Sequence, residues 1–216
     1  PLIDPQLPQD EVEKFCEPKV QGVPVAKSLE DWEKHVAEWR TNMFEHVIYR
    51  GQAAEWRKQP SAVVWLDELK GGPGYRLKKL RYEILPGLWV PAVLYEPTQL
   101  SGKVPVVMNV NGHDTQDGKA ADYKQIRCIN QAKRGMLALN VEWLGMGQLN
   151  TDGFGHYRMN QLDLCGTSGI APFYLALERG LDVLLQRLQA DPGRVAVAGL
   201  SGGGQSSSVR STGELR

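Results

Sequence analysis

Residues 190–204 read ADPGRVAVAGLSGGG and decide the fold, because they place a serine directly after a short apolar run. The run at 195–200 (VAVAGL) has the composition of a strand that is buried on both faces. Residues 199–203 (GLSGG) match G-x-S-x-G, the nucleophile elbow, a strained turn between strand and helix that presents a serine above a sheet. The sequence therefore predicts a serine nucleophile at Ser201.

The glycines of the elbow have separate roles. Gly199 and Gly203 lack the Cβ atoms that would clash in so tight a turn. The amide of Gly202 follows the nucleophile and is expected to donate one hydrogen bond to a developing oxyanion. A plain Gly/Ser-rich loop is the alternative, but the apolar run before it favours the elbow. A dinucleotide loop is excluded, because residue 207 is Ser where G-x-G-x-x-G needs Gly.

The chain before the elbow alternates between strand and helix. Short apolar runs predict three buried strands, at 104–110, 136–141 and 195–200. Helical periodicity predicts two helices between them, at 122–133 and 171–188. Strands that alternate with helices in this way form a mostly parallel α/β sheet.

An antiparallel hairpin is expected upstream. Two β-rich runs, at 75–85 and 88–95, are separated by the turn signal Pro86-Gly87. Pro91 lies inside the second run and cannot donate to a sheet ladder, so we expect that strand near an edge or at a bulge.

Residues 1–74 are expected to hold an arm and an amphipathic helix. Residues 1–27 are proline-rich and aperiodic, which indicates an extended arm. Ser28 has the position of an N-cap for a helix that ends near Gly51. Its apolar stripe is predicted to pack against the body of the domain and consists of Trp32, Val36, Trp39, Met43 and Val47.

Composition narrows the choice of partners and cofactors. Lys plus Arg and Asp plus Glu both total 25, so neither nucleic acid nor an anionic membrane is an expected partner. No apolar run approaches the roughly 20 residues that span a bilayer. Cys16, Cys128 and Cys165 are too few and too scattered for a disulfide framework or a zinc site, and no metal or cofactor is expected. Compartment and oligomeric state stay open; the first residue is Pro, which is compatible with a removed signal.

A second candidate site element is the loop at 111–114 (NGHD), which follows the strand at 104–110. Loops beyond the carboxyl ends of parallel strands are where α/β proteins bind ligands. The loop can supply the second oxyanion amide, from His113 or a neighbour, or it can be a plain Asn-Gly turn capped by Asp114. Both interpretations stay open, and His113 as general base is the less favoured role.

These blocks together resemble a known family. The blocks are LWVPA at 88–92, VNGH at 110–113, EWLGMG at 142–147, DPGRV at 191–195 and GLSGGG at 199–204. They resemble bacterial α/β-hydrolases related to acetyl xylan esterases, dienelactone hydrolases and prolyl oligopeptidases, over residues 28–204. The resemblance implies hydrolysis through a Ser-His-acid triad, with a small-molecule or carbohydrate ester as substrate. It also implies an incomplete α/β-hydrolase fold at 75–204, with an antiparallel N-terminal hairpin and a helical extension before it.

The chain departs from that family after the serine. The triad order in this fold is Ser, then acid, then His. The fifteen residues after Ser201 include Glu214 but no histidine, and 205–216 reads as an atypical tail. We therefore expect a C-terminally truncated serine esterase that is inactive as this chain, with the strand at 195–200 left at a sheet edge. A non-catalytic fragment or binding module, and a prolyl oligopeptidase-type peptidase, are the alternatives.

All four histidines precede the serine. His35 and His46 fall on the polar flanks of the first helix, where a solvated side chain is expected. His156 lies in a glycine-containing loop that could border the pocket, although a surface position is the favoured interpretation.

Overall fold

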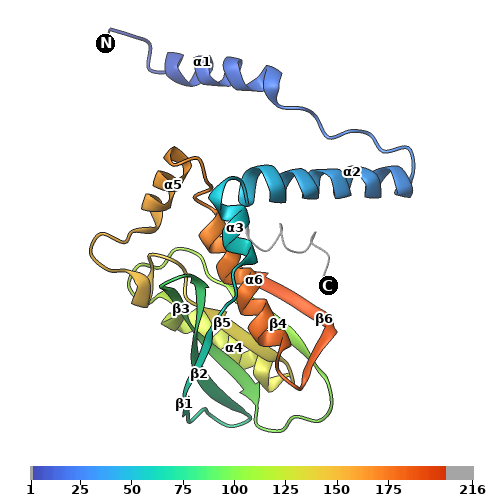
Figure 1. Ribbon diagram of the computed structural model, residues 1–216, viewed down its shortest axis with the longest axis vertical. Helices are drawn as coiled ribbons and strands as arrows, with labels where there is room; N and C mark the ends of the chain where they lie inside the picture. The colour runs from blue at the N-terminus through green and yellow to red at the C-terminus, as the bar shows by residue number, and fades with distance from the viewer. Residues whose placement is uncertain (1, 203–216) are drawn as a thin grey trace. The chain divides into compact units, whose positions relative to one another are not determined.

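The computed structural model describes residues 2–202 of the chain, so the tail at 205–216 and Gly203 lie outside the described residues. The chain divides into two units, Pro1–Glu38 and Trp39–Arg216. The second unit contains a six-stranded mixed sheet and the helices that cover it (Figure 1).

The first unit is more helical than its sequence suggests. Helix α1 (Leu7–Cys16) and a 3-10 turn, η1 (Glu17–Lys19), replace the predicted extended arm, so that expectation is wrong. Proline does not prevent this helix, because Pro8 sits in its first turn, where the missing N–H has no helical acceptor. A side-chain hydrogen bond of 2.7 Å from Gln9 to Glu13 spans one helical turn.

Helix α2 (Leu29–Asn42) begins as predicted. The Ser28 hydroxyl accepts a hydrogen bond of 3.1 Å from the Asp31 amide, and the Asp31 carboxylate accepts one of 2.9 Å from the Lys27 amide. This reciprocal pairing satisfies backbone donors that the first helical turn leaves without partners.

The apolar stripe predicted for this helix is only partly buried, with Met43 packed against a hydrophobic core. Trp39 is 41% exposed, and Trp32 and Val47 are exposed as well. The α-helix ends at Asn42 and continues as a π-helical turn, η2 (Met43–Ile48), whose wider spacing rotates the following residues away from a straight 3.6-residue stripe. Ile48 and Tyr49 are buried instead, and helix α3 (Gln52–Lys58) follows.

The sheet has the strand order β1-β2-β3-β5-β4-β6. The strands are β1 (Val63–Leu69), β2 (Tyr75–Leu85), β3 (Leu88–Pro97), β4 (Val104–Val110), β5 (Leu137–Val141) and β6 (Ala190–Gly199). Neighbours from β1 to β5 are antiparallel, whereas β4 pairs in parallel with both β5 and β6. The predicted hairpin, the α/β class and the parallel strands around the elbow are confirmed. Among the described strands β6 lies at the sheet edge, as expected.

Two details of the sheet differ from expectation. Strand β1 was not predicted and lies within 1–74; most of its side chains are exposed, so its sequence lacks the alternation of a half-buried strand. Strand β3 is interior rather than an edge. The ladder between β3 and β5 ends at the pair of Ala92 with Val141. Pro91 lies just beyond that pair, where its carbonyl accepts a hydrogen bond from the Glu142 amide. Pro91 is tolerated because its missing N–H falls where the ladder ends.

Helices cover both faces of the sheet. Helix α6 (Ala171–Leu185) packs on the face that carries Leu94, Met108 and Leu139, in the larger hydrophobic core. Helix α4 (Asp122–Lys133) packs on the opposite face, where Cys128 and Ala132 contact Tyr95 and Ala138. The strict alternation of these strand residues between the two cores explains why the strands read as continuous apolar runs.

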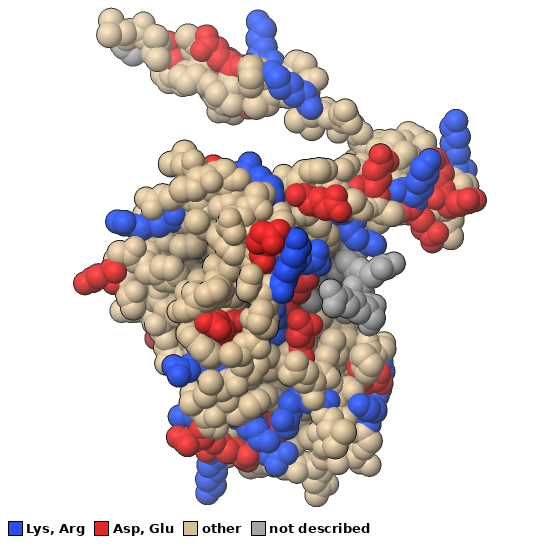
Figure 2. Space-filling model, in the orientation of Figure 1, with Lys and Arg blue, Asp and Glu red and all other residues tan. Residues whose placement is uncertain are grey.

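The surface carries charges of both signs. Figure 2 shows acidic and basic side chains interspersed over the visible face, in keeping with a formal net charge of zero. No helix among residues 2–202 is long and apolar enough to cross a membrane.

Because Trp39 is partly exposed, its replacement by alanine should cost less folding stability than the loss of a fully buried side chain. Leu139 is fully buried, so Leu139→Ala should lower the free energy of unfolding by about 2–5 kcal/mol, and Trp39→Ala by clearly less. Urea denaturation of both variants measures the difference. Equal losses would mean that the tryptophan stripe is buried in solution after all.

Candidate active site

The elbow has the strained backbone that its sequence predicts. Ser201 lies two residues beyond the end of β6 and has φ +59°, and it is the one non-glycine residue with positive φ among residues 2–202. A left-handed conformation costs a residue with a Cβ on the order of 1–3 kcal/mol and persists only where the surrounding structure enforces it. The Ser201 side chain is exposed, so its hydroxyl is accessible above the sheet.

Sheet register brings the loop at 111–114 to the elbow. Val110 at the end of β4 pairs with Gly199 at the end of β6, so the segments that follow leave the sheet side by side. A Cβ on Gly112 would lie 2.7 Å from the Leu200 carbonyl oxygen and 3.1 Å from the Ser201 Cβ. Only glycine fits at position 112, because the 2.7 Å distance to a backbone oxygen is shorter than real Cβ contacts.

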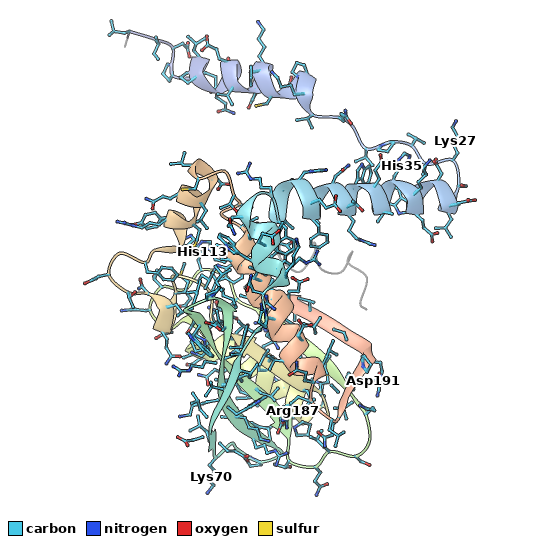
Figure 3. All side chains as sticks on the ribbon, viewed as in Figure 1. Lys27, His35, Lys70, His113, Arg187 and Asp191 are labelled. Atoms are coloured by element: carbon cyan, nitrogen blue, oxygen red, sulfur yellow. The ribbon has the colours of Figure 1, made fainter. Side chains whose placement is uncertain are left out.

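His113 lies next to the elbow and faces His156. A Cβ placed on Gly202 would be 3.8 Å from Cε1 and Nδ1 of the His113 ring. The Nε2 atoms of His113 and His156 are 2.7 Å apart, and the two rings meet edge to face. Figure 3 labels His113 on the loop after β4, whereas His156 begins the 3-10 turn η5 (His156–Asn160).

The histidine pair was missed by the sequence analysis, which favoured a surface position for His156. The block EWLGMG at 142–147 contains Gly145, where a Cβ would lie 2.3 Å from the His156 amide nitrogen. The loop after β5 and the segment at 156 therefore touch, and both border the elbow region. His35 stays on α2, near Asp31, and takes no part in this site.

The contact between the rings constrains their protonation. One Nε2 must donate and the other accept, so at least one imidazole is neutral when the hydrogen bond forms. Burial lowers the pKa of His156 below its ordinary value, and the neighbouring His113 lowers that pKa further. His156 is therefore well suited to stay neutral near pH 7.

Buried charges lie beneath the loop. The Lys119 ammonium pairs with the Glu142 carboxylate at 2.9 Å, and both side chains are almost fully buried. Glu142 also accepts hydrogen bonds from the amides of Lys119, at 2.8 Å, and Gln148, at 3.2 Å. One carboxylate thus ties the 3-10 turn η3 (Gly118–Ala120) to the 3-10 turn η4 (Gly147–Leu149).

Buried amides fix the start of the same loop. The side-chain amide nitrogen of Asn111, Nδ2, donates to the Val141 carbonyl and to the Asn140 side-chain oxygen, both at 2.7 Å. Asn140 in turn donates to the Lys119 carbonyl at 2.9 Å. Charged and polar residues at the carboxyl ends of β4 and β5 therefore hold the loop that passes Ser201. Among the described residues, no group of three His, Cys, Asp or Glu side chains could bind a metal ion.

Known structures share this architecture. No model of a protein family and no curated protein matches the chain. A protein of Bacteroides fragilis NCTC 9343, described as a candidate acetyl xylan esterase, superposes with a TM-score of 0.64 and 20% identity over 83% of this chain and 51% of its own. Methylesterase BT1017 gives a TM-score of 0.70 and 20% identity over 87% of this chain and 40% of its own.

A third match agrees with the first two. Acetyl xylan esterase 1 from Thermoanaerobacterium sp. JW/SL YS485 gives a TM-score of 0.58 and 14% identity, over 86% of this chain and 59% of its own. The chain has the α/β-hydrolase fold, which confirms the resemblance inferred from its sequence blocks. It spans between 40% and 59% of the length of these three structures.

The strain at Ser201 can be measured. Ser201→Gly should be about 1 kcal/mol more stable than Ser201→Ala, because glycine adopts φ +59° without the clash that a Cβ causes. The two free energies of unfolding, from the same denaturant series, give the difference. Ser201→Ala as the more stable variant would contradict a strained elbow.

The histidine pair predicts a specific titration. In His113→Asn, the pKa of His156 should rise but stay below its ordinary value, because burial, the larger cause of the shift, remains. NMR titration of the imidazole carbons measures this pKa. Since the folded state protonates His156 less readily than the unfolded chain does, the pair should weaken folding as the pH falls below about 6.5. An unchanged pKa in the variant would mean that the rings do not interact.

Proposed function

We propose that this chain carries the nucleophile and the oxyanion donors of a carboxylic ester hydrolase. The observation that supports it most is Ser201, held at φ +59° at the end of β6, with the Gly112 backbone packed against it. A strained serine between a buried strand and a glycine-rich loop serves acyl transfer by presenting its hydroxyl to a carbonyl carbon. Residues 75–204 are the proposed catalytic part of the chain, and the segment before them is an extension.

The proposed reaction has two halves. Ser201 Oγ attacks the ester carbonyl carbon and passes its proton to a base, and the carbonyl oxygen becomes an oxyanion. The amides of Gly202 and His113 donate hydrogen bonds to that oxygen. The bond to the leaving alkoxide then breaks, the base returns the proton to it, and an acyl-enzyme forms at Ser201. Water hydrolyses the acyl-enzyme through the same steps.

Carbohydrate esters are the proposed substrate class. The matched structures are named as acetyl xylan esterases and a methylesterase, and acetyl xylan is an acetylated carbohydrate. Sequence identities of 14–20% establish a shared fold but not a shared substrate. A small-molecule or carbohydrate ester is therefore a proposal for this chain. The mechanism itself requires no cofactor.

The identity of the general base decides between the proposed esterase and a second candidate function. All four histidines precede Ser201 in the sequence, and His113 and His156 are the ones beside the elbow. In this fold the base comes from a histidine after the nucleophile. A chain that lacks that residue could bind an ester without turnover, as a non-catalytic binding module.

The 216-residue chain is therefore expected to be a poor esterase by itself. Its hydrolysis of p-nitrophenyl acetate should exceed that of Ser201→Ala by no more than a marginal amount, since triad bases supply several orders of magnitude. Initial rates of both proteins, at equal concentration and after subtraction of buffer hydrolysis, make the comparison. A large Ser201-dependent rate would instead identify His113 or His156 as the base, which His113→Asn and His156→Asn would separate.

A further inference from the structure

Lys124 is a buried cation that the proposed mechanism leaves unused. It lies in the first turn of α4, and its side chain is 1% exposed. An ammonium group that is removed from water is costly unless acceptors surround it. Its burial therefore needs a reason beyond packing.

The acceptors around Lys124 belong to the loop at 111–114 and to the start of η3. Its Nζ donates to the Gly118 carbonyl at 2.8 Å and to the Gly112 carbonyl at 3.4 Å, and it lies 3.6 Å from the Asp114 carboxylate. Three acceptors match the three protons of an ammonium group. Burial lowers the pKa of Lys124, while the Asp114 and Glu142 carboxylates oppose that shift and favour the charged form.

The position of the Gly112 carbonyl determines where the next amide points. The described chain has no cis peptide bond, so the Gly112 carbonyl and the His113 N–H point in opposite directions across a planar peptide. Lys124 holds the carbonyl on the α4 side. The His113 N–H is therefore turned away from α4. The elbow lies close to this peptide, since a Cβ built on Gly112 would be 3.1 Å from the Ser201 Cβ and 3.4 Å from the Gly202 amide nitrogen.

We infer that Lys124 is a positioning residue for the oxyanion hole: by holding the Gly112 carbonyl, it orients the His113 N–H toward the oxygen of an ester bound at Ser201. This inference rests on the proposed function. It assigns Lys124 no contact with substrate and no proton transfer. Its effect on the reaction passes entirely through the peptide between Gly112 and His113.

A matched substitution separates this role from simple stabilisation. Lys78 on β2 lies 3.2 Å from Glu96, which is fully buried. Lys78→Met therefore removes a lysine from an ion pair with a carboxylate, as Lys124→Met does, but on a strand that does not carry the elbow loop. Lys124→Arg keeps the positive charge and the donors, and should restore part of the effect.

The experiment has two readouts on the 216-residue chain. The first is the rate at which a fluorophosphonate modifies Ser201, because the reaction places negative charge on an oxygen in the oxyanion hole. The second is the position of the His113 amide signal in a ¹H–¹⁵N NMR spectrum, which does not depend on any reaction at Ser201. Circular dichroism confirms that each variant is folded.

Lys124→Met should slow the modification of Ser201 by about 10²-fold and shift the His113 amide signal, as expected when one oxyanion donor is lost. Lys124→Arg should recover part of both effects, and Lys78→Met should change neither. Modification at the wild-type rate in folded Lys124→Met would overturn the inference. If Lys124→Met does not fold, Lys124→Gln, which retains a neutral donor, takes its place and should show the same changes at smaller size.

Failure of the proposed function gives a different pattern. If the wild-type chain itself is not modified at Ser201, the serine is not activated in this chain, and the NMR readout alone decides the role of Lys124. A His113 signal that shifts in Lys124→Met and moves back in Lys124→Arg then supports the orientation of the peptide. A signal that stays in place refutes it.

Discussion

The whole candidate site depends on one close approach, that of the Gly112 backbone to the elbow. A Cβ at position 112 would lie 2.7 Å from the Leu200 carbonyl oxygen, so no other residue fits there. The approach follows from the parallel pairing of β4 with β6, in which Val110 and Gly199 are opposite each other. Two loops that are far apart in sequence therefore meet at Ser201, and one of them brings His113 to Gly202.

Such an approach must be enforced, because loops with free polar groups are mobile. The enforcement comes from charges and amides that the structure buries under the loop. Asn111 at the start of the loop donates to β5, and Lys119 in η3 pairs with Glu142, which follows β5. Lys124 on α4 donates to the Gly118 carbonyl between them. Buried ionic groups add little net stability, but when fully satisfied they select one arrangement among many. Here the selected arrangement places the peptide between Gly112 and His113 beside a strained serine.

The sequence predicted what local patterns encode and missed what tertiary packing decides. Apolar runs and helical periodicity sufficed for the strands around Ser201 and for α4 and α6, because these elements are buried or amphipathic. Strand β1 was missed because its exposed edge carries no alternation, and Pro91 was placed wrongly because a ladder can end at a proline inside a sheet. The pairing of His113 with His156 depends on how two loops fold back, and no spacing in the sequence encodes that.

The most direct test of the central claim is to ask which residue of the chain a fluorophosphonate modifies. Modification is a single irreversible event, so a reaction too slow to give measurable ester hydrolysis still accumulates an adduct over hours. Peptide mapping by mass spectrometry, with heat-unfolded protein as the control, should find one adduct on Ser201 in the folded chain and none after unfolding. An adduct on another serine, or equal modification of folded and unfolded protein, would contradict a nucleophile prepared by the elbow.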